Sequence, residues 1–281
     1  MSRHIDRFPA PAEPEHKKLI VLSAPRTGTL GLYHALQILG FKPYHMAEVL
    51  TNGADHARFL SEGVQASTEG TFQPYGRAEF DKWFAGYDIV VEMPFFMLTE
   101  VVQAYPDGKF LLMERDPDKW ATSWLNTIGP LTLKFTRFPT NLLKYFDPLS
   151  RVFGDFSVVI RRIYLQSDEN GPEAHRNLVE HYKKYIAKVK AIVPPQQLKV
   201  CRLEDGFGWD EICPCLGVPN PPEGTEWPGR NKPEEFFKIS NDALSGGKSK
   251  ALILASVLAP LVAVGIWYAK ADGAKWLPKI F

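Results

Sequence analysis

"LIVLSAPRTGTLGLYHALQILGF", residues 19–41, decides the fold. The apolar run at 18–23 is too continuous for a strand with one wet face, so it predicts a strand buried on both faces in a parallel sheet. After a short loop that contains Gly28, leucines recur with helical spacing up to Gly40, where a helix commonly stops. Such a loop presents backbone N–H groups and the positive end of a helix to an anion. The stretch therefore predicts an anion site between a strand and a helix.

Three more strands are predicted, at 87–94, 109–115 and 197–205. Helical patterns separate them. One begins at Asp116, which can cap the helix that Pro117 starts, and another covers 172–193. Strands that alternate with helices need crossover connections. We therefore expect an α/β fold of three layers, in which helices cover a mostly parallel sheet.

The composition bounds the class of protein. The 281 residues are 45% hydrophobic, which is enough to bury a core. Thirty-three Lys and Arg against 32 Asp and Glu leave the net charge near zero, so no nucleic-acid partner is expected. The three cysteines, Cys201, Cys213 and Cys215, include no C-x-x-C pair and are expected to be reduced thiols.

Composition also divides the chain into five parts. Residues 1–17 are polar and proline-rich and are expected to form a flexible N-terminal arm without a signal peptide. Residues 18–237 form the α/β domain, 238–250 a linker, and 270–281 a short tail. Residues 251–269 hold no charge and would extend roughly 28 Å as a helix, close to the ~30 Å thickness of a bilayer. We expect a transmembrane helix there, acting as a single-pass C-terminal anchor that leaves the catalytic domain in the cytosol. A buried core helix is the alternative.

The loop departs from two known phosphate-binding motifs. The nucleoside triphosphatase motif G-x-x-x-x-G-K-[ST] needs a glycine, a lysine and a hydroxyl where this chain has Ser23, Thr29 and Leu30. The dinucleotide motif G-x-G-x-x-G is represented only by Gly28 and Gly31. An ordinary strand-to-helix turn remains a second interpretation of the loop taken alone.

Two other predicted strands end on side chains suited to a reaction. Arg115 ends one strand and Ser123 follows it by eight residues, so a guanidinium and a hydroxyl can converge on a phosphate, although Arg115 could also merely cap its strand. Glu92 ends another strand among apolar neighbours, so we expect burial to raise its pKa toward neutrality and make it a proton acceptor. A surface glutamate is the alternative. Ligands gather at the carboxyl ends of parallel strands, so these residues should meet around one cavity.

The loop "APRTGT", the Arg115 and Ser123 pair and the Glu-x-Pro at 92–94 together resemble the sulfotransferase family. The likeness extends over roughly residues 18–237 and includes "LEDGFGWDEICPCLGVPNPP" and "WPGRNKPEEFF", which look like segments of a fungal and microbial branch. The resemblance implies a P-loop-like fold and the donor 3′-phosphoadenosine 5′-phosphosulfate (PAPS). It implies that the 5′-phosphosulfate is held by Pro25, Arg26, Thr27, Gly28 and Thr29.

By the same resemblance, Arg115 and Ser123 would bind the 3′-phosphate, with Arg230 as a further contact. Glu92 would take the proton of the acceptor hydroxyl, while Arg26 would stabilise the leaving phosphate, and no metal ion is needed. Where many relatives have a threonine and a tryptophan near the adenine, this chain has Leu30 and Gly31.

These departures leave two alternatives open: an atypical P-loop nucleotide kinase or NTPase, and a catalytically inactive membrane-anchored scaffold. The aromatic stretch from Phe135 to Phe156 favours an apolar small-molecule acceptor, such as a phenol, sterol or lipid. The sequence does not indicate an oligomeric state.

Overall fold

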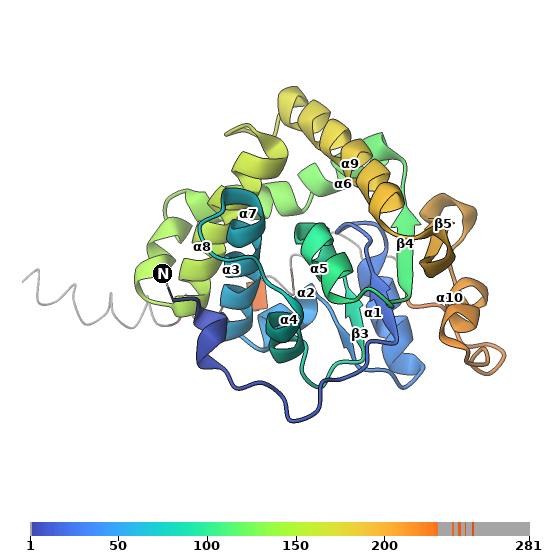
Figure 1. Cartoon of the computed structure of the whole chain (residues 1–281). Coiled ribbons are helices and arrows are strands. Elements are labelled where there is room, and N and C mark those ends of the chain that lie inside the picture. Colours follow the sequence, from blue (N-terminus) through green and yellow to red (C-terminus); the bar gives the residue numbers. More distant parts are fainter. Residues whose placement is uncertain (1, 230–237, 239–240, 243–244, 246–248, 250–281) are drawn as a thin grey trace, which may run out of the picture.

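The computed structural model of the chain describes residues 2–229 together with 238, 241, 242, 245 and 249. Within them, five parallel strands form one sheet in the order β2-β3-β1-β4-β5 (Figure 1). They are β1 (Leu19–Val21), β2 (Pro43–Tyr44), β3 (Ile89–Val91), β4 (Phe110–Glu114) and β5 (Leu198–Arg202). The four strands expected from the sequence are present, but the expected ranges 87–94 and 197–205 were too long, because β3 ends at Val91 and β5 at Arg202. β2 could not be expected, because two residues that begin with a proline carry no strand pattern.

Helices surround the sheet. They are α1 (Thr29–Ile38), α2 (Met46–Thr51), α3 (Ala54–Glu69), α4 (Arg77–Trp83), α5 (Leu98–Ala104), α6 (Pro117–Leu125), α7 (Ile128–Thr136), α8 (Pro148–Ile160), α9 (Pro172–Ile192) and α10 (Trp209–Leu216). Shorter turns are the 3-10 segments η1 (His4–Arg7), η2 (Met93–Phe96), η3 (Thr140–Tyr145), η5 (Pro195–Gln197) and η6 (Leu203–Asp205), and the π-helical η4 (Arg161–Leu165).

The two faces of the sheet are buried under different helices. Leu19 and Val21 of β1 pack in one apolar cluster with residues of α1 and α10. Ile20, between them, packs in the other cluster with residues of α4, α5, α6 and α9. Alternate residues of one strand point to opposite faces, so a run without polar residues is what a sheet covered on both faces requires. The α/β fold of three layers is confirmed.

Helix α6 begins as its sequence indicates. An Oδ1 oxygen of Asp116 accepts a hydrogen bond of 2.9 Å from the backbone N–H of Lys119, and Pro117 is the first residue of the helix. A proline loses nothing at that position, since the first backbone N–H groups of a helix have no partner within it. The cap fixes where α6 starts relative to the end of β4, and therefore which of its side chains face the end of the sheet.

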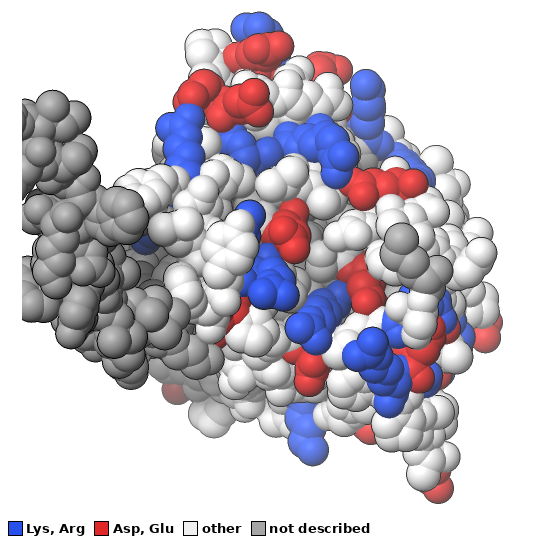
Figure 2. Space-filling view, turned by 90° about the vertical axis from the view of Figure 1, so that its left-hand side faces the viewer, with Lys and Arg blue, Asp and Glu red and all other residues white. Residues whose placement is uncertain are grey.

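Residues 130–165, in which the sequence pattern is loose, form most of α7 together with η3, α8 and η4. α8 packs against α3, and Figure 1 shows these helices together at one side of the sheet. On the outer surface, Phe138 and Tyr145 are 78% and 65% exposed. Figure 2 shows this side of the molecule, where Lys, Arg, Asp and Glu are interspersed among a larger area of uncharged residues.

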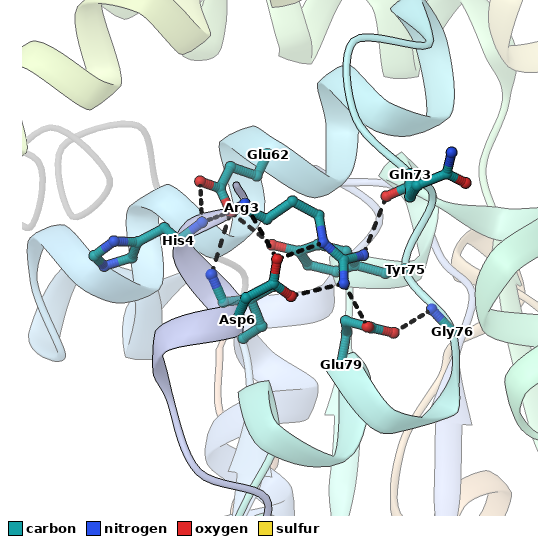
Figure 3. Close-up of polar contacts among 9 residues, drawn as sticks. Arg3, His4, Asp6, Glu62, Gln73, Tyr75, Gly76 and Glu79 are labelled. Carbon is teal, nitrogen blue, oxygen red and sulfur yellow. Dashed lines mark hydrogen bonds and ion pairs between the residues drawn. The ribbon is translucent and has the colours of Figure 1, made fainter. Parts of the chain in front are cut away.

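Within the N-terminal arm, which was expected to be flexible, residues 3–8 are folded. Ile5 is fully buried, and the side chain of Arg3 donates hydrogen bonds to Asp6 at 2.8 Å and to Glu79 at 2.6 Å (Figure 3). Glu62 of α3 accepts hydrogen bonds from the backbone of His4. Composition could not indicate this, because the partners lie about 60 to 80 positions further along a chain whose first residues are locally polar.

The expected anchor at 251–269 lies outside the described residues, as do the tail at 270–281, most of the linker and Arg230. Among the helices that the structure does describe, none combines the length and the apolar character needed to cross a bilayer. The three cysteines are free thiols, as expected.

Candidate active site

A cavity of about 630 Å³ lies at the carboxyl ends of the strands. Residues from three expected groups line it together: Arg26 after β1, Glu92 after β3, and Arg115 and Ser123 after β4. Pro25, Gly28 and Thr29 line it too. Its size falls within the roughly 300–1,000 Å³ of small-molecule sites.

The cavity has two ends of different chemistry. The charged and hydroxyl-bearing residues come from the loops that follow the strands and from α6. The other wall is apolar and is built mainly from α6, α7 and α8, by Trp124, Ile128, Leu131, Phe135, Leu149, Phe153, Phe156 and Ile160. One cavity could therefore hold a polar anion beside an apolar molecule.

The loop after β1 is held by hydrogen bonds from β4, which pairs with β1, and from the helix α6 that follows β4. Ser23 Oγ accepts from the backbone N–H of Met113 at 2.8 Å, and Trp120 Nε1 donates to the carbonyl of Pro25 at 2.7 Å. Thr27 is fully buried and its hydroxyl donates to the carbonyl of Ala24 at 2.6 Å. The Thr27 side chain therefore bonds within the loop, and Thr27 does not line the cavity, whereas Arg26 and Gly28 do.

Gly28 caps the start of α1 with a backbone φ of +91°, a conformation that other residues adopt only with strain. A Cβ added there would lie 3.0 Å from Leu203 Cδ1. At Gly31, a Cβ would lie 2.9 Å from the carbonyl oxygen of Pro228. The absence of a side chain at Gly31 thus lets the segment at 227–229 rest directly on α1.

Arg26 reaches the cavity from a left-handed backbone position, with φ 70°. Its Nε lies 3.4 Å from Ser123 Oγ, and Arg115 Nη1 donates to the Arg26 carbonyl at 2.7 Å. Burial lowers the pKa of Arg26, the charge of Glu92 opposes this and that of Arg115 adds to it. A guanidinium stays charged at neutral pH even so, and two cations therefore stand side by side at this end.

Glu92 also has a left-handed backbone, with φ 71° and ψ −38°, and is 5% exposed. Its Oε2 accepts from Thr29 Oγ1 at 2.5 Å and from His45 Nε2 at 3.0 Å. Burial alone would raise the pKa of Glu92, but His45, Thr29 and the charge of Arg26 together lower it below its ordinary value of 4.5. The expectation of a raised pKa was wrong, because it counted the apolar neighbours and missed the donors. The side chain is a carboxylate at neutral pH.

Sequence patterns did not indicate His45 or Lys119, which also line the cavity. His45 follows β2, and the shortness of that strand hid its position at the end of the sheet. Lys119 precedes Ser123 by one helical turn on α6, a spacing that could have revealed it. It adds a third cation to the polar end.

Comparison with known proteins identifies the family of the chain. The sulfotransferase domain family matches residues 18–236. Ava biosynthesis cluster protein M of Aspergillus versicolor is 30% identical over 207 residues, which are 73% of this chain and 77% of that protein. A crystal structure of a sulfotransferase from Alicyclobacillus acidocaldarius is 15% identical, with a TM-score of 0.41, and the match covers 87% of this chain and 96% of that one. From the family match and the fungal relative, the chain belongs to the sulfotransferase domain family.

Proposed function

We propose that the protein transfers a sulfuryl group from PAPS to the hydroxyl of an apolar small molecule. The observation that carries the proposal is one cavity in which Arg26, Glu92, Arg115 and Ser123, from three separate segments, stand beside an apolar wall. Sulfuryl transfer needs such a pairing, because a highly charged donor and a neutral acceptor must meet in one space.

The donor would occupy the polar end. The loop from Pro25 to Thr29 precedes α1, and helix starts of this kind bind phosphate through free backbone N–H groups. Arg115 and Ser123 would hold the 3′-phosphate, and Lys119 on the same helix adds a charge-assisted contact. Thr27 would contribute through its backbone only, since its hydroxyl bonds to Ala24.

The reaction would be an in-line displacement at sulfur. The acceptor oxygen forms a bond to sulfur while the bond from sulfur to the bridging phosphate oxygen breaks, and 3′-phosphoadenosine 5′-phosphate (PAP) leaves. Glu92 takes the proton of the acceptor hydroxyl, because it is a carboxylate that lines the cavity. Arg26 and the loop amides stabilise the charge that develops on the leaving phosphate.

The experiment measures donor binding and transfer separately. A hundredfold excess of PAP over its Kd should stabilise the fold by about 2.7 kcal/mol. Radiolabelled PAPS, offered with a panel of phenols, sterols and long-chain alcohols, should label an acceptor. Glu92→Gln should keep PAP binding and lose about 10²-fold or more in kcat. Arg26→Ala should lose both.

Arg162→Ala is the matched control, because that guanidinium is 63% exposed, pairs with Glu69 on the surface and does not line the cavity. It should behave as the wild type. Stabilisation by magnesium ATP in place of PAP would favour a nucleotide kinase or NTPase instead. A protein that binds neither nucleotide would be a scaffold, and the proposal would then be refuted.

We also propose that residues 251–269 anchor the protein in a membrane, with the catalytic domain on the cytosolic side. The charge-free composition of that stretch supports this. Tyr145 is 65% exposed, and tyrosine is one of the residues that favour membrane interfaces. The full chain should resist carbonate extraction from membranes, and deletion of 251–269 should release it. Recovery of the full chain in the soluble fraction would contradict the anchor.

A further inference from the structure

The two hydrogen bonds on the Glu92 carboxylate fall on one oxygen. Thr29 and His45 both donate to Oε2. Oε1 accepts no hydrogen bond from any described residue, and the side chain lines the cavity. A carboxylate held in this way by one oxygen has the other available for a hydroxyl of the acceptor.

His45 has both ring nitrogens committed. Nδ1 accepts from the backbone N–H of Ala47 at 3.1 Å, so that nitrogen carries no proton and caps α2. Nε2 is therefore the nitrogen that donates to Glu92. The side chain is 7% exposed, and the ring of Tyr33 lies 5.3 Å from the imidazole. His45 cannot accept a proton from a substrate without breaking one of these two bonds.

We infer that His45 is a positioning residue for Glu92: the cap on α2 orients the imidazole, and the imidazole fixes the carboxylate so that Oε1 meets the acceptor hydroxyl. The inference rests on the proposed sulfuryl transfer at this site. Such a support fits the strained position of Glu92, because a residue with positive φ keeps its conformation only where surrounding contacts hold it.

Two substitutions separate the two bonds of His45. The amide oxygen of asparagine lies near the place of Nδ1, so His45→Asn keeps the cap on Ala47 and is too short to reach Glu92. The amide nitrogen of glutamine lies near the place of Nε2, so His45→Gln keeps the donor to Glu92 and gives up the cap. If His45 served only to cap α2, His45→Gln should lose more activity than His45→Asn, because only the glutamine variant gives up the cap.

We expect His45→Asn to lower kcat about tenfold or more, with the KM for PAPS unchanged, because a misplaced base costs rate and not donor binding. The low-pH side of the kcat–pH profile, its acid limb, should move to higher pH in this variant, since burial raises the pKa of Glu92 once a donor is lost. His45→Gln should stay within about threefold of the wild-type kcat, with its acid limb in place. The other groups near the pair are Arg26 of the loop, Tyr33 of α1 and Glu48 of α2, which accepts from Tyr33, and all three are intact in both variants.

The reverse ranking of the two variants, or equal losses in both, would overturn the inference. If the acid limb of the kcat–pH profile disappears in both variants, the titrating group is His45 and not Glu92, and the inference is overturned as well. An infrared titration of the Glu92 carboxylate, identified by subtraction of Glu92→Gln, needs no activity. Protonation at higher pH in His45→Asn alone supports the contact, and the same titration in all three proteins refutes it. If the titration behaves as expected and PAPS transfer is absent, only the proposed function fails.

Discussion

At the scale of single residues, two of the side chains that face the cavity are carried by unfavourable backbone. Arg26 and Glu92 both have φ near 70° without being glycine. Such positions cost of order 1–3 kcal/mol each and persist only where surrounding contacts hold them. Here the contacts are the Arg115 bond to the Arg26 carbonyl and the two bonds on Glu92 Oε2. The strain lets each side chain turn from the end of a strand into the cavity.

The charge state of Glu92 should make the free energy of unfolding depend on pH. Its pKa in the fold is lower than its ordinary 4.5, so ionisation stabilises the wild type above that pH. This contribution, about 1.4 kcal/mol for each pH unit between the two pKa values, is lost as the pH falls below 4.5 toward the folded value. Glu92→Gln has no such dependence. The free energy of unfolding of the wild type relative to this variant, measured in urea, should therefore be constant from pH 8 to 6 and fall below pH 5. A difference that rises at low pH would mean that the pKa is raised.

At the scale of elements, what the sequence predicts depends on whether a pattern is local. β1, β3 and β4 lie in continuous apolar runs, whereas β5 has a weaker pattern that includes two charged residues. The start of α6 is indicated by two adjacent residues, Asp116 and Pro117. β2 is too short to show a pattern, and so the position of His45 beyond its end was missed. Glu92, Arg26 and Arg115 could be predicted to meet because parallel strands end at one edge. Which oxygen of Glu92 is held, and by what, depends on side chains from three elements and could not.

The turn into α1 gives a prediction with an internal control. Gly28 and Gly40 both have positive φ, of 91° and 82°, but only at Gly28 would a Cβ meet a neighbour, Leu203. Each change to alanine should cost about 1–2 kcal/mol of unfolding free energy for the left-handed backbone. Gly28→Ala should in addition weaken PAP binding about tenfold, roughly 1.4 kcal/mol, because the loop must shift. Calorimetry of both variants measures this. Equal PAP affinities would show that the loop geometry is unimportant for the donor.

The first turn, η1, should contribute to stability despite its polar sequence. Ile5 is fully buried, whereas Ile38 at the end of α1 is 51% exposed. Ile5→Ala should lower the free energy of unfolding by about 2–4 kcal/mol, as expected for a buried isoleucine. Ile38→Ala should change it by less than about 0.5 kcal/mol. Urea denaturation of the two variants compares them directly, and similar values would mean that the N-terminal segment is a loose arm after all.

At the scale of the whole molecule, the two ends of the cavity come from different parts of the fold. The polar end belongs to the edge of the sheet and the start of α6, and the apolar wall is built largely on α7 and α8. In the sequence, the residues of the polar end belong to short motifs, whereas those of the apolar wall lie in an aromatic stretch that has no motif. In the proposed reaction, the residues that contact the acceptor can therefore change without disturbing those that bind the donor, and selectivity for the acceptor should depend on α7 and α8.

Helix α7 offers a pair of leucines that tests this division. Leu131 and Leu133 are both half-buried, but only Leu131 lines the cavity. With a series of alkyl phenols as acceptors, KM in the wild type should fall about fourfold for each added CH₂ that is buried, as ~0.8 kcal/mol per group implies. Leu131→Asn should flatten this dependence and leave PAP affinity unchanged, because a polar side chain in the wall removes the gain from burying the chain. Leu133→Asn should match the wild type in both. A wild-type KM independent of chain length would show that the acceptor does not bind against the apolar wall.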